Sequence, residues 1–195
     1  MIEAGFTFEH PETRTRILVL ESDAETSGMS WFLEVTHYSI LQTDVSEHLH
    51  MTWTETSEII SGTAKYGLDG IEKIAKAGET LVVEPRQLHV HPWSATEEPP
   101  LVYRQRSRFA HASPAAVQDI LGIFATRAGM AHAGKVPANG LDKLLQQAVT
   151  VRTMTRHGTY ASTPSMVVQN ALGSTLGLVA ELLGYKAVHP EYVGD

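Results

Sequence analysis

The sequence contains no cysteine among its 195 residues. This absence excludes disulfide bonds, cysteine nucleophiles, iron–sulfur clusters and zinc sites built from thiolates. A metal ion would have to be bound by histidine, carboxylate or methionine side chains instead. A chain of this length buries roughly 70% of the surface that its unfolded state exposes, so its core needs no structural metal. A metal found in this protein is therefore expected to serve function.

Basic clusters and a basic, apolar leader segment are also missing. The formal net charge is −7, and no run of lysine or arginine predicts a positively charged surface that would bind nucleic acid or an anionic membrane. Glu3 and Glu9 interrupt the first ten residues, which lack the apolar run of a secretory signal. We therefore expect no nucleic-acid partner, no membrane partner and a cytoplasmic location.

Charge and periodicity both change near residue 105. Residues 1–104 hold 17 acidic and 7 basic side chains, a net charge of −10, whereas residues 105–195 hold 5 and 8, a net charge of +3. Short β-branched and apolar stretches in the first part, separated by Gly, Pro, Asp and Ser, predict an all-β barrel or sandwich. The predicted strands include residues 16–20, 31–37, 59–60, 80–83 and 101–103.

The pattern after Phe109 is helical and predicts three helices, at about 114–131, 141–155 and 164–183. Ser113-Pro114 and Thr163-Pro164 each place an N-cap residue before a proline in the first turn. No linker of disordered character separates the two parts. We expect a β-barrel domain at residues 1–108 and a helical extension at residues 109–195 that packs on it.

The last predicted helix is unusually apolar. Its run over residues 166–183 is interrupted by Gln169, Asn170 and Glu181, so it is a poor membrane-spanning segment. Gly173 and Gly177 suit close packing of a helix on a protein surface, and they also match a membrane dimer motif. Burial against the protein is the favoured interpretation, and contact with a membrane interface is the alternative.

Candidate metal ligands lie in two short segments. His48 and His50 are spaced to share one face of a strand, as are His89 and His91, and Glu55 follows the first pair closely. Ten histidines would give about 0.5 His-x-His pairs by chance, so two pairs are only mildly unusual. Imidazoles with a carboxylate form a site suited to Fe, Mn, Co, Ni, Cu or Zn as a divalent ion.

The spacing of these histidines, Glu55 and two glycines resembles the motifs of the cupin superfamily. His48-Leu49-His50, Glu55 and Gly62 fit the ligand part of the first cupin motif. Gly78 and His89 fit the second, and 15 residues, 63–77, lie between the two motifs. The resemblance implies a mainly β fold, a cupin-type double-stranded β-helix barrel, here followed by a C-terminal bundle of about three α-helices.

By the same resemblance, the metal ligands would be His48, His50, Glu55 and His89, holding one divalent ion with iron favoured. The chain departs from the cupin motifs at Gln42, Glu84, Arg86 and Trp93. Arg86 replaces a turn glycine, and a positive φ there would strain a residue that carries a side chain.

Several residues outside the motifs have two alternative interpretations each. His91 is expected to point inward, either as a catalytic, proton-relaying or substrate-contacting residue or as a core histidine. His37 faces either the same cavity or the core. Arg86, Arg104 and Arg106 either clamp a carboxylate substrate or form surface salt bridges. The remaining histidines are expected at the surface or in helix packing, and the aromatic residues Trp53, Tyr66, Trp93 and Tyr103 in the core.

The helical tail is similar to that of a group of small bacterial and fungal cupins without a settled reaction. The resemblance implies a metal-dependent enzyme for a small molecule, most readily a dioxygenase or related oxidoreductase. The apolar tail, as a lid on the barrel, predicts a fairly hydrophobic substrate. Glu55 and His91 are the expected catalytic residues. Biosynthesis of small molecules is a suspected setting. The alternatives are a non-redox isomerase, cyclase or lyase and a non-catalytic binding protein. Because cupins commonly pair through barrel faces, a homodimer is expected.

Overall fold

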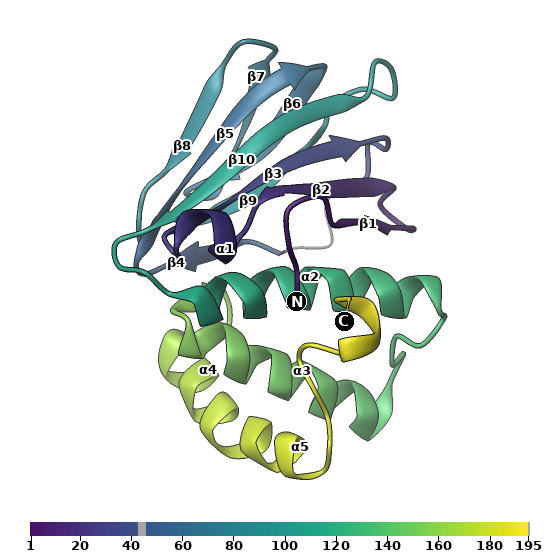
Figure 1. The fold of residues 1–195 in the computed structure, drawn as a ribbon, viewed down its shortest axis with the longest axis vertical. Coiled ribbons are helices and arrows are strands. Elements are labelled where there is room, and N and C mark those ends of the chain that lie inside the picture. Colours follow the sequence, from purple (N-terminus) through teal and green to yellow (C-terminus); the bar gives the residue numbers. More distant parts are fainter. Residues whose placement is uncertain (43–45, 195) are drawn as a thin grey trace.

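Two antiparallel sheets form the upper part of the molecule (Figure 1). The computed structural model describes residues 1–42 and 46–194. The first sheet has the order β1 (Thr7–His10), β2 (Thr15–Glu21), β3 (Ser30–His37), β10 (Leu101–Phe109), β5 (Trp53–Ser61) and β8 (Thr80–Val83). The second has the order β11 (Thr159–Ala161), β4 (His48–His50), β9 (His89–Ser94), β6 (Thr63–Leu68) and β7 (Ile71–Lys76). This arrangement fits the expected cupin-type double-stranded β-helix.

Strand β10 organises the first sheet because it pairs along its length with both β3 and β5. Buried and outward residues alternate along it, as the two-residue period of a strand requires. Its inward side chain Phe109 meets Trp31 of β3 and Trp53 of β5, with ring centroids 5.4 and 4.9 Å apart. These three aromatic rings belong to the main hydrophobic core, which also includes residues of the first helix after β10.

The helices lie below the sheets in Figure 1 and close to the predicted ranges. They are α2 (Pro114–His132), α3 (Gly140–Arg156), α4 (Met166–Leu172), a π-helical turn η1 (Gly173–Gly177) and α5 (Leu178–Leu182). A short helix α1 (Asp23–Thr26) and a 3₁₀ turn η2 (Pro190–Tyr192) complete the fold. Ser113 is the N-cap of α2 as predicted, whereas α4 begins two residues after Pro164, with Ser165 as its N-cap.

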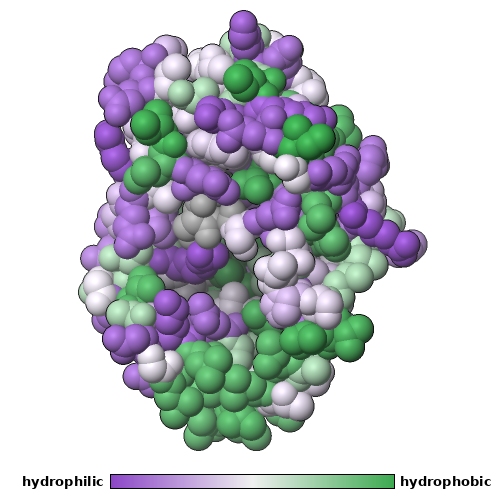
Figure 2. All heavy atoms as spheres, turned by 180° about the vertical axis from the view of Figure 1, so that it is seen from behind, coloured by the Kyte–Doolittle hydropathy of each residue, from purple (hydrophilic) through white to green (hydrophobic). Residues whose placement is uncertain are grey.

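The two glycines of the last helix pack on α3. A methyl group added at Gly177 would lie 2.7 Å from the Ala148 carbonyl oxygen, and one at Gly173 would lie 3.1 Å from the Arg152 Cα. Close packing of the last helix on the protein is therefore confirmed for its inner face, where these two glycines of η1 lie against α3. The outer face is not buried: its apolar side chains are exposed, and Figure 2 shows them gathered at the lower end of the molecule. No helix of the described residues has the length and apolarity needed to cross a membrane.

The predicted division at residue 108 has one structural complication, which is β11. This strand lies within the C-terminal extension, yet it pairs with β4 at the edge of the second sheet. Sequence periodicity did not predict it, because three residues are too short for a recognisable alternation. The extension is therefore helical apart from one strand that joins the β-structure.

Arg86 adopts the conformation that its motif position normally gives to glycine. Its φ is +71°, and its backbone N–H donates a 2.6 Å hydrogen bond to the His50 carbonyl oxygen. The turn before β9 therefore keeps the expected shape despite the substitution. The strained backbone conformation belongs to an exposed arginine that lies three residues before β9, the strand with His89 and His91.

Candidate metal centre

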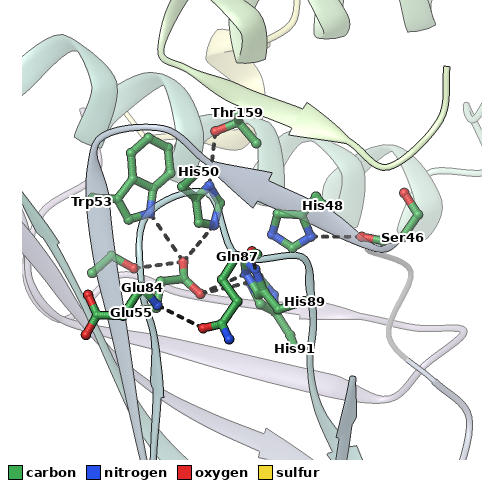
Figure 3. Close-up of polar contacts among 11 residues, drawn as sticks. Ser46, His48, His50, Trp53, Glu55, Glu84, Gln87, His89, His91 and Thr159 are labelled. Atoms are coloured by element: carbon green, nitrogen blue, oxygen red, sulfur yellow. Dashed lines mark hydrogen bonds and ion pairs between the residues drawn. The ribbon is translucent and has the colours of Figure 1, made fainter. Parts of the chain in front are cut away.

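Four histidines and one glutamate converge from three strands (Figure 3). His48 and His50 occupy alternate positions of β4, and both are buried. Strand β9 lies next to β4, with His48 opposite His89, so His89 and His91 extend the same cluster. Glu55 comes from β5 of the other sheet. The structure thus brings together all five side chains that the sequence singled out.

The distances within the cluster are short. One donor atom from each of His48, His50, His89 and His91 can be chosen so that all lie within 4.8 Å of one another. One Glu55 oxygen is 3.2 Å from His50 Nε2, and the other is 3.4 Å from Nε2 of both His89 and His91. Ser107 Oγ donates a 3.1 Å hydrogen bond to Glu55 and so orients its carboxylate.

The outer ring nitrogens of two histidines have partners that favour one tautomer. His48 Nδ1 lies 2.8 Å from the Ser46 carbonyl oxygen, and His89 Nδ1 lies 3.1 Å from that of Gln87. Because a carbonyl only accepts, Nδ1 of each ring carries the hydrogen. In a neutral ring, Nε2 on the other side then keeps a lone pair that can bind a metal ion. Such hydrogen bonds are typical of metal-binding histidines.

Burial and mutual contact set the charge state of the cluster. Burial lowers the pKa of His48 well below its ordinary value and that of His50 to about 4, so both rings are neutral at pH 7. Burial also opposes ionisation of Glu55, but the surrounding imidazoles, His50 first, outweigh it and lower its pKa. Burial disfavours the charged form of His89 too, yet contact with the Glu55 carboxylate raises its pKa.

These residues fit a divalent metal ion. Nε2 of His50, His89 and His91 is buried and makes no hydrogen bond, which is costly unless another group satisfies it. Donors that bind one ion at about 2.1 Å in neighbouring positions lie about 3.0–3.4 Å apart, which matches the contacts of Glu55. The donor set of imidazoles and one carboxylate suits Fe, Zn, Cu or Ni. The cluster is therefore a candidate site for a metal ion whose identity is open.

A cavity of about 600 Å³ extends from the cluster toward the helices. His48, His50, Glu55 and His91 line its inner end, while His89 lies behind them. Its walls are mainly apolar and come from α2, α3, α4 and η1, including Ile120, Phe124, Val151, Met154, Leu172 and Leu176. This volume is in the range of small-molecule sites in proteins. The helical extension thus forms most of the wall that a ligand would meet.

Sequence analysis did not predict three of the residues that lie at the site. His10, expected at the surface or in helix packing, is half-buried and lines the cavity. Trp31 lines it as well, and Thr159 contacts His50. Trp53 is buried as expected but also stacks on His50. None of these had a local signal, since only the folded chain brings them to β4.

The other candidates lie elsewhere. His37 is fully buried at the end of β3, where its Nδ1 contacts the Ser39 carbonyl oxygen, and it does not line the cavity. Arg104 pairs with Glu34, and Arg106 pairs with Glu21. Like Arg86, they are absent from the cavity wall. The salt-bridge interpretation therefore holds for Arg104 and Arg106.

No protein-family model matches the sequence, and no curated protein does either. Solved structures are similar in fold. A predicted oxalate decarboxylase from Thermotoga maritima has 16% identity and a TM-score of 0.43, over 49% of this chain and 80% of that one. A cupin-like protein from the same organism has 18% identity and a TM-score of 0.42, over 55% and 76%.

A third structure, a Klebsiella pneumoniae protein with a double-stranded β-helix domain, has 22% identity and a TM-score of 0.40, over 49% of this chain and 77% of that one. Similarity at this level concerns the fold alone. The topology of the chain itself, with two antiparallel sheets and the paired histidines on adjacent strands, agrees with the motifs in the sequence. The fold of the chain is therefore of the cupin type.

Proposed function

We propose that the protein is a metal-dependent enzyme acting on a small, fairly hydrophobic organic molecule, by dioxygenase or related oxidoreductase chemistry. The observation that carries this proposal is the meeting of a histidine cluster with a largely apolar cavity. His48, His50, Glu55 and His89 would hold the ion. A bound divalent ion would supply Lewis acidity and, with iron, a position at which dioxygen can react.

The residues of the chain would bind and orient the substrate. His91 is on the cavity wall, whereas His89 is not, so a ligand meets His91 first. The apolar residues of α2 and α3 would bury the body of the molecule and exclude water. Its polar end would then lie at the histidines.

A non-redox reaction is the second candidate, and Glu55 favours it. This carboxylate is buried on the cavity wall, where it would act as a general base once it leaves the ion. It would accept a proton from a substrate held against His91. Isomerisation, cyclisation and elimination all need such a base.

Metal analysis tests the proposal. Protein purified without a histidine tag is expected to contain close to one equivalent of metal by mass spectrometry, and His89→Ala is expected to lose it. His111→Ala, which removes an exposed histidine away from the cavity, is the matched control. Absence of metal, even after reconstitution with Fe(II), Mn(II), Co(II) and Zn(II), would leave a non-catalytic binding protein as the better interpretation.

The redox and non-redox candidates can then be separated. Nitric oxide binds Fe(II) as dioxygen does and gives an electron paramagnetic resonance signal. We expect this signal from anaerobic, iron-loaded protein, since dioxygenase chemistry needs an open position on the ion. An iron-loaded protein that gives no signal, or one that purifies with zinc alone, would favour the non-redox reaction.

A further inference from the structure

The strand that carries His48 and His50 is held in place by the C-terminal extension. Strand β11 pairs with β4 so that Thr159 is opposite His50 and Ala161 is opposite His48. Two further backbone hydrogen bonds extend the pairing, from Met51 N–H to the Gly158 carbonyl at 2.9 Å and from Ser162 N–H to the Glu47 carbonyl at 2.9 Å. The extension thus meets β4 along its whole length.

Without this pairing, β4 would have little support. It is three residues long, and its partner on the other side, β9, is in register with it at His48 alone. Short edge strands with few hydrogen bonds open readily. Strand β11 turns β4 from an edge strand into an inner one, and it does so at the two residues expected to bind the ion.

Strand β11 is in turn fixed to α4 by one buried side chain. Gln169 accepts a 3.0 Å hydrogen bond from Ala161 N–H and donates to the Ala161 and Pro164 carbonyls at 2.8 and 2.6 Å. This side chain is 3% exposed, and all its contacts are local to the extension. A continuous set of hydrogen bonds therefore links the last helix to the histidine-bearing strand.

His50 also differs from its neighbours in the partner of its outer ring nitrogen. His48 and His89 each use the carbonyl oxygen two residues earlier. His50 Nδ1 instead lies 3.4 Å from Thr159 Oγ1, and both side chains are buried (Figure 3). If the hydroxyl accepts from Nδ1–H, the lone pair of Nε2 faces Glu55 and the centre of the cluster.

We propose that Thr159 is a positioning residue for His50, through which the helical extension becomes part of the metal site. The inference rests on the proposed function, since it concerns metal affinity. Removing such a hydrogen-bond partner typically weakens metal binding by 10- to 100-fold.

The test uses full-length protein with Thr159→Val, which keeps the side-chain shape and removes the hydroxyl. We expect an affinity for Zn(II), measured by competition with a chromophoric chelator, that is lower by about tenfold. Thr159→Ser restores the hydroxyl and is expected to recover most of the affinity. Thr153→Val is the matched control, because Thr153 is equally buried in the extension but bonds the Val149 carbonyl and does not line the cavity.

A second measurement reads the hydrogen bond directly. In proton spectra of the Zn(II)-loaded protein, the Nδ1–H of His50 should exchange slowly with solvent in the wild type and in Thr153→Val, but fast in Thr159→Val. Unchanged zinc affinity and unchanged exchange in Thr159→Val would overturn this inference alone. A wild type that binds no zinc would overturn the proposed function and this inference with it.

An independent observation concerns the outer face of the last helix. Seven of its side chains that do not line the cavity are apolar and at least two-fifths exposed, namely Met166, Val167, Val168, Leu178, Val179, Leu182 and Leu183. Glu181 is the only charged residue of the segment, and it turns inward to Arg152 and Arg156. The face therefore presents no charge that would repel a second copy or select a charged partner.

The area of this face matches what a dimer needs. Its side chains expose on the order of 800 Å², which is about the area that each partner buries in a standard interface. An uncharged apolar surface is also self-complementary, as a two-fold interface requires. We infer that the occupant is a second copy of this chain, paired through α4, η1 and α5.

Light scattering after size exclusion tests this interface. We expect twice the chain mass of 21.4 kDa for the wild type and a single chain for Leu182→Glu. Ile74→Glu, at an exposed apolar position on β7, is the control for pairing through the barrel. A dimer dispersed by Ile74→Glu but not by Leu182→Glu would overturn the inference. A monomeric wild type would do so as well, and its sedimentation with phosphatidylcholine vesicles would assign the face to lipid.

Discussion

The imidazole of His50 lies nearly parallel to the indole of Trp53, with ring centroids 4.1 Å apart and planes 20° apart. The indole N–H of Trp53 also points to Glu55, at 3.5 Å. Trp53 therefore forms one wall of the candidate metal centre, and its emission reports on that centre.

Binding of a paramagnetic ion should quench tryptophan fluorescence. One equivalent of Co(II) is expected to remove a large part of the emission, because Trp53 stacks on a candidate ligand. Zn(II), which has a closed shell, should quench much less. The quenching should disappear in His89→Ala, and equal quenching in that variant would place Co(II) elsewhere.

His89 and His91 should differ in their effect on metal binding. His89 is at the back of the cluster, with 2% of its side chain exposed, whereas His91 has 11% exposed and lines the cavity. We expect His89→Ala to lose the metal and His91→Ala to keep one equivalent at an affinity about tenfold weaker. Isothermal titration with Zn(II) measures both. Equal loss in the two variants would show that His91 is as essential a ligand as His89.

Filling the cavity should block apolar ligands without affecting the metal. Val151 lines the cavity from α3, so Val151→Trp is expected to weaken binding of the neutral dye Nile red by at least tenfold. Leu141→Trp, at an exposed position of the same helix outside the cavity wall, is the control. Fluorescence titration gives the affinities. A dye affinity unaffected by Val151→Trp would mean that the dye binds on the outer apolar face.

Gly177→Ala should destabilise the protein by about 1–3 kcal/mol. The added methyl group would meet the backbone oxygen of Ala148 and the Arg152 side chain, both at 2.7 Å, so α3 and the last helix would have to separate. Ser174→Ala, at an exposed position in the same turn, should stay within about 0.5 kcal/mol of the wild type. Urea unfolding monitored by circular dichroism measures the difference. A neutral Gly177→Ala would show that the contact is loose.

Arg86→Gly should stabilise the protein. A positive φ costs a residue with a side chain about 1–2 kcal/mol, and the greater unfolded-state entropy of glycine offsets about 0.5–1 of this. A net gain of about 0.5–1 kcal/mol in unfolding free energy is expected. Arg86→Ala retains the Cβ and is expected to give no such gain. A gain of equal size in Arg86→Ala would point to the arginine side chain rather than to the backbone.

The main features of the fold were predictable because their signals are local. Helix ranges followed from periodicity and from capping residues such as Ser113. The grouping of His48 with His50, and of His89 with His91, followed from the two-residue period of a strand. That both pairs and Glu55 belong to one centre followed only from the resemblance to cupin motifs, since periodicity does not place one strand beside another.

Other features depend on contacts between distant parts of the chain. The sequence did not predict β11, the position of His10 on the cavity wall or the contact of Thr159 with His50, across 109 residues of chain. It also left open which face of the last helix is covered, because its apolar residues surround the axis.

Sequence by itself therefore determined several of the barrel strands, the helices and the chemical type of the candidate site, since each rests on the spacing of neighbouring residues. The tertiary structure alone decided that the extension supplies a strand, a cavity wall and a partner for His50. Such pairings depend on which surfaces pack together, and packing is settled by shape and burial over the whole molecule.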